Sequence, residues 1–209
     1  PGFGLWARMN NASWSQLHSL SPNIVTAGNI DNKDGDDLVV DFGPPFGIWV
    51  LRNNFLWTQV HALSAEIIVT KDIDNVGGGD ILIDFGPGFG LWARLNDALW
   101  VPLYDQSPVN MGVGNLDSFE ANELIADFGG NGIWALYNFG FFKVPDNWQI
   151  LNASSAESFA VGNIDGKAGD DLIGDFGGSG LWALINNSGW SLLDAASPGT
   201  MDTGEIDNN

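Results

Sequence analysis

Three acidic stretches hold the residues whose types and spacing could do chemistry. They lie at residues 29–38, 72–81 and 163–172, and each places oxygen-bearing side chains at alternating positions around a mid-loop glycine, with an aspartate near its end. This pattern is typical of calcium-binding loops, because calcium takes six or more oxygen ligands. The alternative is that the aspartates accept hydrogen bonds from nearby backbone N–H groups and so hold a turn.

The composition excludes several classes of partner. Among 209 residues, 26 are acidic and 7 basic, for a formal net charge of −19. Such a polyanion repels nucleic acid and anionic membrane surfaces, so we expect neither as a partner. The absence of cysteine excludes disulfides and thiolate chemistry, and no apolar run has the length of a membrane span. The chain begins within a repeat at Pro1, so the lack of a signal peptide carries no weight.

A repeat of about 43 residues runs through the whole chain. Its anchors are tryptophans spaced by 43, 43, 42 and 48 residues: Trp6, Trp49, Trp92, Trp134 and Trp182. An asparagine follows each anchor by four residues. A second tryptophan follows each by eight residues, except in the fourth copy, which carries six extra residues within 138–147. Five copies in one register indicate units that pack on one another, since 43 residues are too few for an independent domain.

Each repeat predicts four short β-strands. In the second copy the apolar segments are residues 47–51, 56–62, 66–73 and 80–85, and turn residues separate them. Four strands repeated at this period are the signature of a β-propeller blade. We therefore expect an all-β protein, a five-bladed β-propeller forming a single domain over residues 1–209.

The last of the five predicted blades is incomplete. The first copy starts after its Asp-Phe-Gly strand and the fifth ends at Asn209, so this blade is assembled from both termini and is one strand short. An unpaired edge invites strand exchange or oligomerisation. A fragment of a longer array, or an amplified or engineered one, would look the same.

The repeated aromatic residues have two interpretations. Tryptophans that recur inside strands suit packing between neighbouring blades, whereas exposed ones could serve as platforms for sugar rings. The stretch from Asp84-Phe85-Gly86 to Trp92 recurs in the other copies. We interpret it as the corner between the second and third strands of a blade, with its glycines allowing the tight turn.

Together these repeats resemble the FG-GAP and VCBS type of propeller repeat, over the whole chain. The resemblance implies an extracellular or cell-surface protein and a calcium loop between the first and second strands of a blade. The residues at the first, third and ninth ligand places would be Asn29, Asp31 and Asp37; Asp72, Asp74 and Asp80; and Asn163, Asp165 and Asp171. The fifth place carries no oxygen side chain, being Lys33, Val76 or Lys167. The second loop is the best candidate, because a lysine opposes a cation.

No residues in the sequence point to catalysis. His18 and His61 occupy one repeat position, filled elsewhere by Tyr104, Asn152 and Asp194, which suggests a surface strand position rather than a general base. No nucleophile motif, phosphate loop or histidine cluster occurs. The one break in symmetry, residues 139–145, is either an apolar contact site or a longer hairpin folded back on its blade.

The leading hypothesis is a non-enzymatic binding or structural repeat module, with a protein or glycan partner. The alternative is a lectin with one sugar site per blade, because five-bladed propellers of the tachylectin type resemble this architecture. A third possibility, a glycosidase, would need two carboxylates facing one pocket.

Overall fold

The computed structural model describes residues 3–119, 121–139 and 147–203. Within these ranges the chain forms four four-stranded antiparallel sheets, one two-stranded hairpin and two short 3-10 turns, η1 (Gly129–Asn131) and η2 (Gly177–Ser179). The expectation of an all-β protein built from repeated four-stranded units is confirmed.

The strands follow one another regularly along the chain. The hairpin consists of β1 (Leu5–Met9) and β2 (Ser13–His18). The first sheet contains β3 (Ile24–Gly28), β4 (Asp37–Asp41), β5 (Ile48–Arg52) and β6 (Leu56–His61). The second contains β7 (Ile67–Lys71), β8 (Asp80–Asp84), β9 (Leu91–Leu95) and β10 (Leu99–Tyr104). The third contains β11 (Asn110–Gly114), β12 (Glu123–Asp127), β13 (Ile133–Leu136) and β14 (Trp148–Asn152). The fourth contains β15 (Ser158–Gly162), β16 (Asp171–Asp175), β17 (Leu181–Leu184) and β18 (Trp190–Asp194).

The sheets are offset from the sequence repeat by half a unit. The four segments predicted in the second copy correspond closely to β5, β6, β7 and β8. The structure pairs β5 and β6 with β3 and β4, and β7 and β8 with β9 and β10. Each Asp-Phe-Gly corner therefore joins the second and third strands of one sheet, as predicted, and each acidic loop joins the first and second.

Asparagine turns close the hairpins between the third and fourth strands. Asn53 and Asn54, between β5 and β6, have φ values of 51° and 63°, and Asn96 and Asp97 have 51° and 56°. Positive φ at both central residues is the requirement of a type I′ hairpin turn, which asparagine tolerates better than most residues. This requirement explains the asparagine that follows each anchor tryptophan by four residues.

The apolar core lies between successive sheets. Alternate residues of a strand point to opposite faces, and β8 shows the consequence, since all five of its residues are buried. Its Ile81 and Ile83 pack with Val39 and Val50 of the first sheet, whereas Leu82 packs with Leu124 of the third. The sheets thus stack face to face like blades, with the innermost strands β3, β7, β11 and β15 next to one another.

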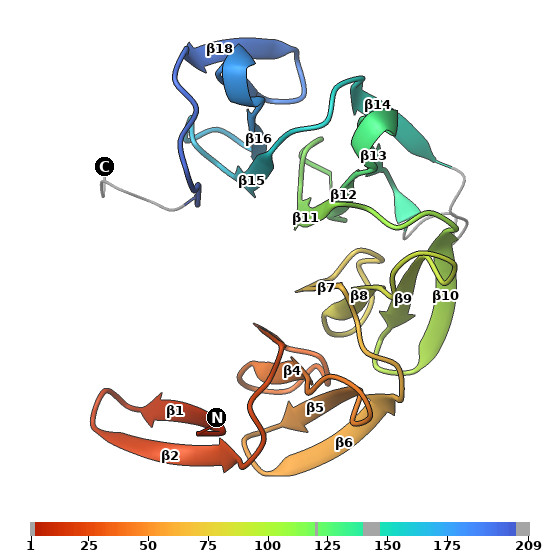
Figure 1. Ribbon diagram of the computed structural model, residues 1–209, viewed down its shortest axis with the longest axis vertical. Coiled ribbons are helices and arrows are strands. Elements are labelled where there is room, and N and C mark those ends of the chain that lie inside the picture. Colours follow the sequence, from red (N-terminus) through yellow and green to blue (C-terminus); the bar gives the residue numbers. More distant parts are fainter. Residues whose placement is uncertain (1–2, 120, 140–146, 204–209) are drawn as a thin grey trace.

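The sheets form an arc that begins with the β1–β2 hairpin and ends with the β15–β18 sheet (Figure 1). In the described residues, the blade expected from both termini is not formed, because β1 and β2 pair only with each other. Thr203 donates its hydroxyl to the Val161 carbonyl at 2.7 Å, as Thr70 does to the Ala27 carbonyl at 2.7 Å. The chain near Thr203 therefore lies beside β15 as β7 lies beside β3.

Most of the symmetry-breaking insertion lies outside the described residues, and Phe139, at its start, is buried in the core between the second and third sheets. None of the described helical segments could cross a lipid bilayer.

Candidate functional site

The Asp-Phe-Gly corners turn aromatic side chains toward the gap between sheets. In the second sheet the Phe85 N–H donates to the Gly90 carbonyl at 3.1 Å, which closes the corner. Gly90 has a φ of 71°, and a Cβ there would come within 2.4 Å of the Tyr104 carbonyl oxygen. Only glycine fits this position. The indole N–H of Trp92 donates to the Phe89 carbonyl at 2.8 Å, so the corner also orients the anchor tryptophan.

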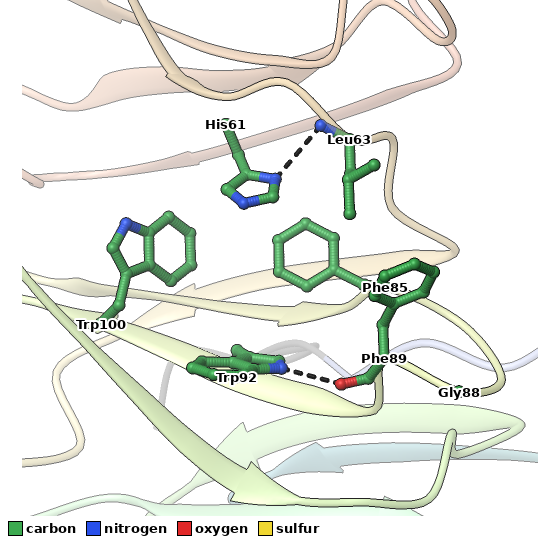
Figure 2. Close-up of a pocket in the computed structure, with 7 residues that line it drawn as sticks. All are labelled: His61, Leu63, Phe85, Gly88, Phe89, Trp92 and Trp100. Carbon is green, nitrogen blue, oxygen red and sulfur yellow. Dashed lines mark hydrogen bonds between the residues drawn. The ribbon is translucent and has the colours of Figure 1, made fainter.

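A pocket opens between the first and second sheets at this corner. Its volume is about 300 Å³, and it is lined by His61, Leu63, Phe85, Gly88, Phe89, Trp92 and Trp100 (Figure 2). The His61 ring lies 4.5 Å from Phe85 and 5.3 Å from Trp100, measured between centroids. His61 and Leu63 come from the end of β6 and its following turn, whereas the other residues come from the next sheet. The pocket therefore exists only where two sheets meet.

The same cluster recurs at the other interfaces. His18, at the end of β2, packs 4.4 Å from Phe42 and 5.3 Å from Trp57 of the first sheet. Tyr104 packs 4.7 Å from Phe128 and 5.6 Å from Trp148 of the third sheet. At the fourth sheet Phe176 and Trp190 keep their contact at 5.4 Å.

We number the interfaces along the chain, from the first, between the β1–β2 hairpin and the first sheet, to the fourth, between the third and fourth sheets. The fourth interface has a second pocket of about 270 Å³, with a more polar lining. Its residues are Asn152, Ser154, Ser155, Phe176, Ser179, Trp182 and Trp190. The aromatic Phe176, Trp182 and Trp190 are the repeat equivalents of Phe85, Trp92 and Trp100. At the repeat positions of His61, Leu63 and Phe89 this pocket has the polar residues Asn152, Ser154 and Ser179. The tryptophans thus combine both interpretations drawn from the sequence, since they pack between sheets and also line pockets.

The variable position filled by His18, His61, Asn152 and Asp194 has one shared role. In each case a side-chain atom accepts the N–H of the residue two places on: Leu20 at 3.1 Å, Leu63 at 3.2 Å, Ser154 at 2.9 Å and Ala196 at 2.8 Å. Histidine, asparagine and aspartate all offer such an acceptor. His18 and His61 lie at the ends of strands β2 and β6, as predicted, but both are half-buried against a phenylalanine rather than fully at the surface. Sequence reasoning missed the shared role of this position. The signal that could have shown it is that all four residues carry a side-chain hydrogen-bond acceptor.

This arrangement favours the neutral form of His61. Burial lowers its pKa, since an imidazolium would lose hydration in the aromatic pocket. Because Nδ1 accepts the Leu63 N–H, the proton of the neutral ring is on Nε2. Figure 2 shows Nε2 directed toward the pocket, where it can donate to a ligand.

The second acidic loop brings its three predicted ligands together. One carboxylate oxygen each from Asp72, Asp74 and Asp80 can lie within 4.8 Å of the other two. Burial raises the pKa of Asp72, and burial followed by the charges of its two neighbours raises that of Asp80 to about 7. Three like charges in a partly buried site disfavour ionisation, and a bound cation would relieve that cost.

The other two candidate loops contain a lysine instead. Lys33 places its Nζ 2.7 Å from Asp31 Oδ2, and Lys167 does the same to Asp165. These contacts lower the pKa of Asp31 and lower that of Asp165 to about 2. Asn29 and Asn163 donate their amides to the carbonyls of these lysines. An internal ammonium therefore balances the charge in the first and fourth sheets, and no such group stands at Val76.

The ninth-place aspartates have a structural role in all three loops. Asp37, Asp80 and Asp171 are buried and accept N–H bonds from the loop and from the asparagine turn. Asn53, Asn96 and Asn186 of those turns donate to Asp31, Asp74 and Asp165. The turn-holding role considered for the aspartates is thus present in the structure.

Comparison with known proteins identifies the fold alone. No family model matches the sequence, and no curated protein matches it. Among solved structures, one similar chain is described as a lectin from Agrocybe aegerita that specifically recognises non-reducing terminal N-acetylglucosamine. Its TM-score is 0.58 at 17% identity, covering 83% of this chain and 53% of the lectin. This chain therefore spans about half the length of that structure.

Proposed function

We propose that this chain is a non-enzymatic carbohydrate-binding protein whose sites are the aromatic pockets between successive sheets. The observation that carries the proposal is the pocket of His61, Phe85, Trp92 and Trp100, which recurs with its aromatic floor at the fourth interface. This proposal favours the lectin alternative over a purely structural module.

The pocket chemistry suits a pyranose ring. A sugar has apolar C–H faces that pack against aromatic rings, and hydroxyl edges that need hydrogen-bond partners. The pocket offers aromatic side chains and one imidazole N–H. Its volume of about 300 Å³ is at the lower end for ligand sites, which suits a single ring at a chain end.

The fold supports the same proposal. The similar lectin is described as recognising terminal N-acetylglucosamine, and its likeness extends over 83% of this chain. Within the described part of the chain, neither aromatic pocket is lined by a carboxylate, whereas a glycosidase needs a pair. Another pocket is lined by Asp31 and Asp97, but these carboxylates are bound to Lys33 and Arg52. We infer binding without hydrolysis.

The test is a glycan array followed by titration of tryptophan fluorescence. We expect binding of sugars at micromolar to millimolar concentration and a fluorescence change on binding. Phe89→Ala removes a pocket wall, and Phe55→Ala is the matched control, because Phe55 is 77% exposed in a hairpin turn. Binding that is weakened by the first variant and unchanged by the second supports the proposal. An array without any signal contradicts it.

A second function, calcium binding by Asp72, Asp74 and Asp80, rests on the uncompensated charge of this loop. Three carboxylates fit a hard cation, with backbone oxygens and water completing the coordination. We expect excess calcium to raise the melting temperature and chelator to lower it, because a ligand that binds only the folded state stabilises it. A melting temperature unaffected by either would contradict this function. Asp31→Asn is the control, because its loop already contains Lys33.

Three further predictions from the sequence concern the blade number, the repeat family and the location of the protein. We propose a ring of five blades, kinship with FG-GAP repeats, and an extracellular or cell-surface location. We also propose that the free β1–β2 hairpin takes part in strand exchange or oligomerisation. Light scattering coupled to size-exclusion chromatography tests the last point: a monomer at all concentrations would contradict it.

A further inference from the structure

The pockets between the sheets differ in how many polar groups they offer a ligand. This difference bears on the sugar class, and the inference drawn from it rests on the proposed function. In the pocket between the first and second sheets, the Trp92 N–H is committed to the Phe89 carbonyl. Trp100 turns its six-membered ring, rather than its N–H, toward Phe85 (Figure 2). Among the lining residues, His61 Nε2 is the side-chain polar group that is directed toward the pocket (Figure 2).

The open side of this pocket is apolar as well. Leu63 is 41% exposed and Phe89 is 60% exposed, and they stand on opposite sheets at the open side of the pocket. Large apolar side chains at such exposure lose hydration when an apolar group is placed between them. A hydroxyl in the same place would lose its water partners without replacement, which is unfavourable.

The first interface has the same residue types at the equivalent positions. His18 accepts the Leu20 N–H and packs on Phe42, and Phe46, at the repeat position of Phe89, is 44% exposed. The histidine, leucine and phenylalanine therefore occur as a set in two neighbouring interfaces. We call the pocket of His61 and the equivalent aromatic cluster of His18 together the histidine pockets.

The fourth interface keeps the aromatic floor of the pocket, formed by Phe176, Trp182 and Trp190, but has different residues at the rim, which is the open side of the pocket. Ser154 and Ser179 stand where the histidine pockets have leucine and phenylalanine, and Asn152 stands where they have histidine. Ser155 adds a further hydroxyl to the lining, although its own proton is donated to Asp127. Several donors and acceptors thus surround the same aromatic floor, and they suit a sugar edge that carries only hydroxyls.

The third interface closes its rim with its own polar groups. The Asn131 side-chain amide, at the position of Phe89, donates to Gln106 Oε1 at 2.9 Å, at the position of Leu63. This hydrogen bond joins the two side chains across the gap between the second and third sheets. A ligand there would have to break this hydrogen bond, so the third interface is the weakest of the four.

We propose that the chain carries two classes of sugar site. The histidine pockets select sugars with a methyl-ended substituent, such as an N-acetyl group or a 6-deoxy carbon. The methyl enters between leucine and phenylalanine, and Nε2 donates to a neighbouring oxygen of the sugar. The asparagine pocket of the fourth interface binds hydroxyl-rich hexoses and does not distinguish the methyl-bearing ones.

The test reads each interface separately through the indole N–H signals of a ¹⁵N-labelled protein. Trp92 reports the second interface and Trp182 the fourth, assigned by single Trp→Phe substitutions. The probes are the methyl glycosides of N-acetylglucosamine, fucose and glucose. At Trp92 we expect methyl-bearing probes to bind about tenfold more tightly than glucose, the discrimination typical of one buried methyl group. At Trp182 we expect the dissociation constants for glucose and for the methyl-bearing probes to be nearly equal.

Paired variants exchange the two rims. Leu63→Ser with Phe89→Ser is expected to abolish the preference for methyl-bearing probes over glucose at Trp92. The affinities measured at Trp182 should stay unchanged. Ser154→Leu with Ser179→Phe is expected to create this preference at Trp182. The remaining indole signals show that the protein is folded. An equal preference at both interfaces in the wild type would overturn the two classes while keeping carbohydrate binding. If no probe moves any indole signal, carbohydrate binding itself is overturned, and the two classes with it.

Discussion

Ser64 donates a 2.6 Å hydrogen bond from its hydroxyl to Oδ2 of Asp41, which is fully buried. Asp41 ends the second strand of the first sheet, and Ser64 lies on the segment that leaves the same sheet for the next. The other oxygen of Asp41 accepts the Gly43 N–H at 2.9 Å. One carboxylate therefore holds both the Asp-Phe-Gly corner and the connection between sheets. The pair recurs as Asp84 with Ser107, Asp127 with Ser155, and Asp175 with Ser197.

Removing this hydroxyl should destabilise the protein measurably. We expect Ser64→Ala to lower the free energy of unfolding by about 1.5–3 kcal/mol, because a bond to a buried charged acceptor is lost. Ser21→Ala is the matched control. Ser21 is exposed and, among the residues that the structure describes, accepts only the Gly4 N–H, so the change should stay within about 0.5 kcal/mol. Urea denaturation measures both values, and equal effects would contradict the role assigned to Asp41.

The acceptor at the position of His61 can be separated from its ring. His61→Asn keeps the bond to the Leu63 N–H, as Asn152 does to Ser154, and loses the ring contacts with Phe85 and Trp100. His61→Ala loses both. We expect the alanine variant to be less stable than the asparagine variant by about 1 kcal/mol, the usual net value of one hydrogen bond. Identical unfolding midpoints would show that the acceptor contributes nothing.

A lysine placed in the second acidic loop should replace calcium. Val76 occupies the position of Lys33 and Lys167, whose ammonium groups bind Asp31 and Asp165. We expect Val76→Lys to bind Asp74 in the same way and to abolish any rise in melting temperature caused by calcium. Val76→Gln, of similar length without charge, is the control. A calcium response that survives in the lysine variant would place the ion elsewhere.

The raised pKa of Asp80, about 7, predicts a pH dependence with a definite sign. The folded state binds the proton more tightly than the unfolded state, whose pKa is near 3.8. Asp80 therefore favours folding at low pH, and this contribution is lost as the pH rises from about 4 to about 7. In calcium-free buffer, the stability of the wild type minus that of Asp80→Asn should decrease over this window.

Urea denaturation at pH 5 and pH 8 measures that difference for both proteins. Glu123, whose pKa is also raised to about 7 by burial, titrates in the same direction. Comparison with Asp80→Asn isolates Asp80, because Glu123 is present in both proteins. A difference that increases with pH would mean that Asp80 is better stabilised as an anion.

Much of the architecture was determined by the sequence alone. The 43-residue period, the alternation of apolar residues and the turn residues predicted strands close to β5, β6, β7 and β8. They also placed the Asp-Phe-Gly corner between the second and third strands of a sheet. These features depend on the conformational preferences of neighbouring residues, which a repeat displays several times over. The spacing of Asp72, Asp74 and Asp80 likewise predicted a convergence that short loops produce locally.

Only the tertiary structure decided where the pockets form and how the β1–β2 hairpin pairs. His61 and Trp100 meet because two sheets stack, and no local pattern encodes that stacking. Pairing between β1 and β2 alone, and the arc of sheets that follows from it, depend on contacts between distant segments. The shared role of His18, His61, Asn152 and Asp194 was hidden in the sequence because three residue types supply the same acceptor. The rims that separate the pockets became visible only when facing residues were brought together across each interface.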